Sequence, residues 1–193
     1  MDLTQGTDEN RMNRARKMML WFGIVSMAMM FAGLTSAYVV SKKRPDWLDE
    51  FALPNAFIWS TVVILASSVC IFFAKRKVNE GESKTAGILL VATLILGLVF
   101  AALQIGSFSE IISAGYYFTG SESSITTSFI YIIVLAHLAH LAGGIIVLLV
   151  LIYNHFKQRY RAGQTLGLEM GATYWHFVDA LWVYLFLFLY FFR

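Results

Sequence analysis

The amino-acid sequence predicts an all-α integral membrane protein, a bundle of five transmembrane helices. The chain has 193 residues, of which 58% are hydrophobic and only 14% charged, whereas a soluble domain carries about 25% charged residues. Apolar stretches long enough to cross a bilayer core about 30 Å thick occur five times. The links between them are too short for a separate soluble domain, so we expect residues 1–193 to form a single membrane domain.

The predicted spans follow one another with short polar links. They cover about residues 18–40, 55–74, 85–108, 126–153 and 171–192. The first is about 23 residues long, longer than the apolar core of a cleavable secretory signal, which is about 7–15 residues. We therefore expect the first span to stay in the protein. No internal repeat is visible, which disfavours an inverted-repeat transporter.

The distribution of Lys and Arg predicts the orientation of the bundle. Eleven of the 15 basic residues lie before the first span or in the links at 75–84 and 154–170. The other four lie in the link at 41–54 and at Arg193. By the positive-inside rule, the N-terminus is cytoplasmic and the C-terminus lies on the opposite face. The net charge of +3 is small and sits beside apolar stretches, so we expect no nucleic-acid partner.

His137 and His140 lie inside the fourth span, three residues apart on one helical face. Imidazoles bind metals, but no Cys, Asp or Glu accompanies them in this span. A second interpretation is a proton relay, which ionisable groups in membranes often mark. The third is structural: hydrogen bonding to a neighbouring helix, a partner subunit or a lipid headgroup. We favour the structural interpretation and assign no catalytic, cofactor-binding or metal-ligating residue to the chain.

The last span begins with the hexapeptide YWHFVD, which holds Tyr174, Trp175, His176 and Asp179. An ionised Asp near the bilayer centre costs about 2.5–3.5 kcal/mol on insertion scales, so it is expected to face protein rather than lipid. His176 and Asp179 are three residues apart and are placed to bond each other or partners on other helices. Structural bonding is again the favoured interpretation.

Other polar and aromatic residues mark the span ends. Gln104 and Glu110 close the third span, and we expect Glu110 to reach water at the outer boundary. Tryptophans near span ends are typical of anchors at the membrane interface. That interpretation covers Trp21, Trp59, Trp175 and Trp182.

Taken together, these residues resemble subunit III of the haem–copper terminal oxidases in its short five-helix form. The first span resembles a family helix over residues 26–33. The later matching positions are Gln104 with Glu110, His137 and His140 with Gly144, and YWHFVD at 174–179 followed by Trp182. One position departs from the family: Ser26 is followed by Met27 where the family has a glutamate, and a methionine carries no proton.

The resemblance implies a non-catalytic subunit that has no cofactor of its own. Haem and copper are expected in partner subunits, with subunit I as the main contact and subunit II in the same complex. The implied role is to bind phospholipid, stabilise the catalytic subunit and support O2 reduction coupled to proton translocation. The implied location is the bacterial inner (cytoplasmic) membrane, as a multi-pass protein.

Two other functions remain open at this point. The nearer one is a subunit-III-like accessory protein of a nitric oxide reductase, which the catalytic partner would distinguish. The other is a small proton-conducting transporter that uses His137, His140, His176 and Asp179, which proton flux through the isolated chain would support.

Overall fold

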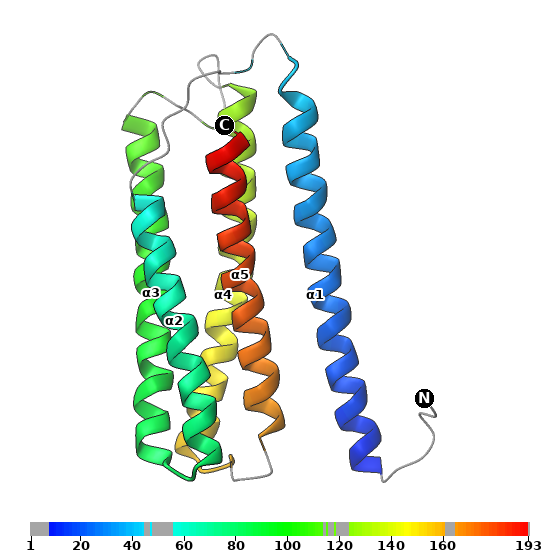
Figure 1. Ribbon diagram of the computed structural model, residues 1–193, viewed down its shortest axis with the longest axis vertical. Helices are drawn as coiled ribbons and strands as arrows, with labels where there is room; N and C mark the ends of the chain where they lie inside the picture. Colours follow the sequence, from blue (N-terminus) through cyan, green and yellow to red (C-terminus); the bar gives the residue numbers. More distant parts are fainter. Residues whose placement is uncertain are drawn as a thin grey trace.

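Five α-helices make up the part of the chain that the computed structural model describes, with no strand among these residues (Figure 1). The described residues are 8–44, 47, 56–113, 115, 118, 124–160 and 165–192. The helices are α1 (Asp8–Ser41), α2 (Ala56–Asn79), α3 (Ser83–Ser113), α4 (Ile125–Phe156) and α5 (Leu166–Phe192). All five are long and apolar enough to cross a membrane, which confirms the predicted all-α, five-span class.

The helices alternate in direction, so the Lys- and Arg-rich segments gather at one end of the bundle. The start of α1, the α2–α3 turn, the end of α4 and the start of α5 lie at the bottom of Figure 1, and the end of α5 lies near the top. Which end faces the cytoplasm stays a prediction. Asn55 of the second predicted span and the basic residues Arg161 and Arg193 lie outside the described residues.

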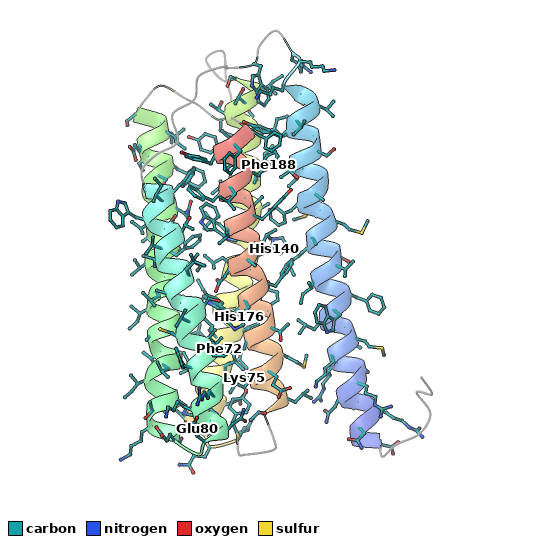
Figure 2. All side chains as sticks on the ribbon, in the orientation of Figure 1. Phe72, Lys75, Glu80, His140, His176 and Phe188 are labelled. Carbon is teal, nitrogen blue, oxygen red and sulfur yellow. The ribbon has the colours of Figure 1, made fainter. Side chains whose placement is uncertain are left out.

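Helices α2 to α5 form one packed bundle, and α1 stands to one side of it. Among the described elements, α1 contacts only α4 and α5, whereas α2 and α3 pack along each other as a hairpin. Large side chains fill the space between the ribbons (Figure 2). The largest fully buried ones include Trp175, Trp182, Phe57 and Phe100. The interior of the protein is therefore centred on the side chains of Trp175 and Trp182, with α5 packed along α2 and α4 and side chains of α3 reaching in.

Local sequence fixes where α4 begins. The Ser124 side chain accepts a hydrogen bond from the Thr127 backbone N–H (3.2 Å), and the Thr127 hydroxyl accepts one from the Ser124 N–H (3.3 Å). This reciprocal arrangement is a capping box, with Thr in place of the usual Glu or Gln. It satisfies backbone donors that the first helical turn leaves without partners.

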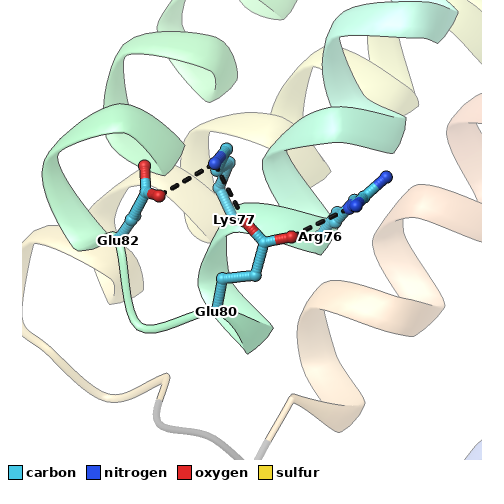
Figure 3. Close-up of polar contacts among 4 residues, drawn as sticks. All are labelled: Arg76, Lys77, Glu80 and Glu82. Carbon is cyan, nitrogen blue, oxygen red and sulfur yellow. Dashed lines mark hydrogen bonds and ion pairs between the residues drawn. The ribbon is translucent and has the colours of Figure 1, made fainter.

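The α2–α3 turn carries a compact network of charges (Figure 3). Lys77 Nζ lies 2.8 Å from Glu80 and 2.9 Å from Glu82, and Arg76 Nε lies 2.8 Å from Glu80. Gly81 has a φ of +81°, a left-handed conformation that glycine adopts at little cost. These hydrogen bonds to cationic side chains hold the pKa of both Glu80 and Glu82 below its ordinary value.

Candidate functional site

The YWHFVD segment lies on α5, where it is tied to a row of small hydroxyl residues on α2. The hydrogen bonds between the two helices are Trp175 Nε1 to Ser67 Oγ (3.1 Å), His176 Nδ1 with Ser68 Oγ (2.6 Å) and Trp182 Nε1 to Thr61 Oγ1 (3.0 Å). Hydrogen bonds of this kind help to associate helices in a membrane, where lipid is as apolar as the helix surfaces.

Trp175 sits where four helices meet. Its indole is 1% exposed and packs against glycines of two further helices. A Cβ atom added to Gly97 of α3 would lie 2.7 Å from the indole, and one added to Gly144 of α4 would lie 3.1 Å from it. The glycines are therefore what allow α3 and α4 to close around Trp175.

The interface-anchor interpretation was wrong for two of the four tryptophans. Trp175 and Trp182 are buried inside the bundle, with relative exposures of 1% and 0%. Their indole N–H groups have hydroxyl partners on α2, so they need no headgroup or water. Trp21 and Trp59 are 59% and 67% exposed, as an interface anchor requires.

His137 and His140 point to different neighbours. His137 is fully buried, with its ring centroid 5.8 Å from that of Phe100 on α3 and 5.1 Å from that of Trp182 on α5. Neither of its ring nitrogens has a hydrogen-bond partner among the described residues. His140 turns toward Phe31 of α1 (5.7 Å between centroids), and its Nδ1 lies 2.7 Å from the carbonyl of Ala136. The two imidazoles thus serve separate contacts.

Asp179 is the most isolated polar group of the segment. It is 2% exposed, and neither carboxyl oxygen has a hydrogen-bond partner in the described part of the chain. No hydrogen bond joins it to His176. The Ser68 hydroxyl is near enough to interact with the carboxyl, although the contact falls short of hydrogen-bond geometry. A buried carboxylate without partners is strongly disfavoured, so the neutral carboxylic acid is the form that suits this environment.

The remaining predicted residues lie at separate places. Gln104 is buried and donates to Ser60 Oγ (2.7 Å) on α2. Glu110 is exposed near the end of α3, and Met27 is half-buried on α1. Tyr174 donates its hydroxyl to the carbonyl of His140 (3.0 Å), which joins α5 to α4.

Comparison with known proteins identifies relatives of this chain. The family described as "Cytochrome c oxidase subunit III" matches residues 3–193. Cytochrome c oxidase subunit 3 of Cyprinus carpio is 34% identical over 146 residues, covering 74% of this chain and 51% of that protein. The protein of that name from Petromyzon marinus is 30% identical over 183 residues (86% and 66%). The one from Bacillus sp. (strain PS3) is 27% identical over 170 residues (86% and 80%).

The chain belongs to the cytochrome c oxidase subunit III family. It spans about half the length of the relatives from Cyprinus carpio and Carassius auratus that it matches. Five helices that suit a membrane span, together with this family, make it a multi-pass membrane protein.

In this member of the family, the described residues include no group of three or more His, Cys, Asp or Glu side chains arranged to hold a metal ion. The polar groups of α5 instead lie inside the bundle. Tyr174, Trp175 and His176 make hydrogen bonds to neighbouring helices there. Asp179 has no hydrogen-bond partner among the described residues. Their geometry therefore suits helix association and, at Asp179, the uptake of a proton.

The hydroxyl residues of α2 are the functional positions that sequence reasoning missed. Ser60 and Ser67, and likewise Thr61 and Ser68, are seven residues apart, and all four contact side chains of α3 or α5. That spacing places them on one helical face. In a membrane span, such a row of small polar residues indicates a face that packs against another helix. It was overlooked because the second span carries none of the motifs that marked the other spans.

Proposed function

We propose that this chain is the non-catalytic subunit III of an aerobic respiratory haem–copper oxidase. Subunit I is the main partner, subunit II lies in the same complex, and haem and copper reside in those partners. The complex lies in the bacterial cytoplasmic membrane, with the N-terminus of this chain inside. The family match over residues 3–193 is the observation that carries the proposal.

The packing of the signature residues supports a stabilising role. Trp175, Trp182 and His176 are joined to α2, and Tyr174 is joined to α4. Side chains engaged in this way hold helices together and are not presented to a substrate. The outer faces of the bundle carry large apolar side chains, which suit lipid or the helices of a partner subunit.

Affinity purification through a tag on this chain in mild detergent tests the proposal. We expect subunits I and II in the mass spectrum, haem absorption and copper in the same fraction, and O2 consumption. Deletion of the chain is expected to shorten the time for which the oxidase stays active, while its initial rate of O2 consumption changes less. A complex that reduces nitric oxide instead of O2 would favour the accessory protein of a nitric oxide reductase. A chain that purifies alone would contradict both.

We further propose that phospholipid occupies a groove between α1 and the α4–α5 pair. The groove has a volume of about 730 Å³, and its lining changes along its length. Apolar side chains such as Leu20, Ile146 and Val150 line its walls, while Asn13 and Arg16 lie toward the charged end of α1. This arrangement matches an acyl chain joined to a phosphate headgroup.

Native mass spectrometry of the complex tests the lipid site. Arg16→Gln is expected to lower the retention of bound phospholipid, because it removes the cation at the charged end of the groove. Arg14→Gln makes the same charge change at a residue that does not line this groove and serves as the control. Equal lipid retention in both variants and the wild type would contradict the assignment.

A further inference from the structure

The carboxyl of Asp179 differs from the other polar signature residues of α5. It is 2% exposed, and neither oxygen has a hydrogen-bond partner among the described residues. The other signature residues of α5 make at least one hydrogen bond to a neighbouring helix. A carboxyl whose only purpose is to join helices would be expected to use its oxygens in the same way. Its isolation indicates that it has another purpose.

Two side chains lead from Asp179 toward the charged end of the bundle. The Ser68 hydroxyl lies near the carboxyl, short of hydrogen-bond geometry, and also lies 2.6 Å from His176 Nδ1. Hydroxyl and imidazole groups both accept and donate protons, so each is able to pass a proton on without a lasting change of charge. Asp179, Ser68 and His176, in this order, therefore form a short proton relay.

The outer end of the relay opens into a groove. His176 lines a groove of about 520 Å³ between α2 and α5, together with Thr173 and residues near the end of α2. Figure 2 shows Glu80, Lys75, Phe72 and His176 in succession from the α2–α3 end toward the middle of the bundle. The half-buried imidazole is thus the point where the groove meets the interior.

The groove that His176 lines carries charged side chains near its outer end. Lys75 lines it together with His176. Arg76 and Glu80 also line the groove. No charged side chain of α3 or α4 lines it within the described part of the chain.

We propose that Asp179 is a proton-binding site inside the bundle, loaded and unloaded through Ser68 and His176 from this groove. A proton from groove water binds His176 Nε2, and the ring releases its Nδ1 proton to Ser68 Oγ. The hydroxyl proton of Ser68 passes to the carboxylate of Asp179, and the reverse sequence returns it to the groove. Only O–H and N–H bonds form and break, and no electron is transferred. The proposal goes beyond the oxidase assignment and does not depend on it.

Infrared spectroscopy of the intact complex in lipid nanodiscs tests the proposal. We expect a carbonyl band from a protonated carboxylic acid, absent in Asp179→Asn, whose frequency shifts when H2O is exchanged for D2O. In His176→Phe and Ser68→Ala, the exchange is expected to slow by about a hundredfold, the lower end of what a positioned proton-transfer group contributes. His176→Asn keeps a hydrogen-bonding group near Ser68 but transfers no proton, so it gives the same answer if the Phe variant does not assemble.

Matched controls separate the relay from general loosening of the bundle. His140→Phe removes an imidazole bonded only to a carbonyl of its own helix, and Ser60→Ala removes a hydroxyl bonded to Gln104. Both are expected to leave the exchange rate unchanged. The proposal is overturned if Asp179→Asn removes no carboxylic acid band, or if Ser68→Ala and His176→Asn exchange at the wild-type rate.

Discussion

Helix α1 and the bundle of α2 to α5 are equally able to cross a membrane, yet they are packed very differently. Of the most apolar part of each helix, 17% of the residues are buried in α1 against 39% in α5. Helix α5 uses Trp175 and Trp182 to bond α2. Helix α1 is joined to α5 by a Thr35–Tyr184 hydroxyl contact (3.0 Å) in its upper half and by a Lys17–Glu169 ion pair (3.6 Å) near its lower end. The 730 Å³ groove lies at the level of the lower contact, where Asn13, Arg16 and Leu20 of α1 line it.

The difference shows what holds helices together when both helix and lipid are apolar. In the bundle, helices approach closely at glycines and are linked by buried hydrogen bonds, which join α2, α3, α4 and α5 into one unit. Helix α1 has glycines too, but Gly23 and Gly33 have no atom within 4 Å of a Cβ placed on them. A small residue therefore strengthens packing only where a large side chain enters the space it leaves. Beside α1, where the packing is loose, the structure leaves the groove of about 730 Å³.

The largest effect is expected from a methyl group added to a glycine that packs against Trp175. Gly97→Ala places a Cβ 2.7 Å from the indole and should cost about 1–3 kcal/mol, as overpacking does. Gly33→Ala, on α1, meets open space and should be neutral or slightly stabilising, because alanine favours helix. Reversible unfolding in mixed detergent measures both free energies. Similar costs at the two sites would show that α1 is packed as tightly as the bundle.

A smaller effect is expected from hydroxyl removal. Thr61→Val leaves the buried Trp182 N–H without its acceptor and should cost about 1–2 kcal/mol. Thr35→Val on α1 removes a part-buried contact to Tyr184, a side chain that is 46% exposed and not enclosed by the bundle, so the cost should stay below about 0.5 kcal/mol. The same unfolding measurement applies, and the reverse ranking would contradict the comparison.

Removing the ion pair at the lower end of α1 should change geometry more than stability. Lys17→Gln is expected to cost at most about 1 kcal/mol, because both side chains are partly exposed. The spread of distances between spin labels on the lower ends of α1 and α5 should widen. High salt should reproduce this widening in the wild type but add little in the variant, and Lys17→Arg should restore the narrow distribution. If the distance distribution stays the same in Lys17→Gln, in Lys17→Arg and at high salt, the Lys17–Glu169 pair does not hold α1 in place.

The smallest effect belongs to the exposed α2–α3 turn. The pKa of Glu80 is lowered by its hydrogen bonds to Lys77 and Arg76. The network therefore contributes fully at neutral pH, and its contribution is lost as the pH falls through the lowered value of the folded state. An NMR titration of Glu80 should give a value below that of an ordinary glutamate, and Lys77→Gln should raise it. A wild-type value at or above the ordinary one would show that the ion pairs of Figure 3 do not persist.

Much of the fold followed from the sequence, but the partners of the signature residues did not. Hydrophobic length alone located five helices, because a span must satisfy its backbone hydrogen bonds internally. Asp179 is buried inside the bundle, as the sequence predicted for a carboxyl within a span. By contrast, His137 and His140 share a helical face in sequence yet contact different helices. Helical periodicity gives the direction of a side chain, not the identity of what it meets.

The sequence by itself determined the class of the protein, the number of its helices and its family, because composition, apolar length and the YWHFVD motif are local properties. Only the tertiary structure decided that Trp175 is enclosed by Gly97 and Gly144 and that α2 supplies the hydroxyl partners. It also decided that neither carboxyl oxygen of Asp179 has a hydrogen-bond partner among the described residues. These facts depend on how helices distant in sequence approach one another. In a membrane that approach is set by side-chain shape and hydrogen bonding between helices, which no single span contains.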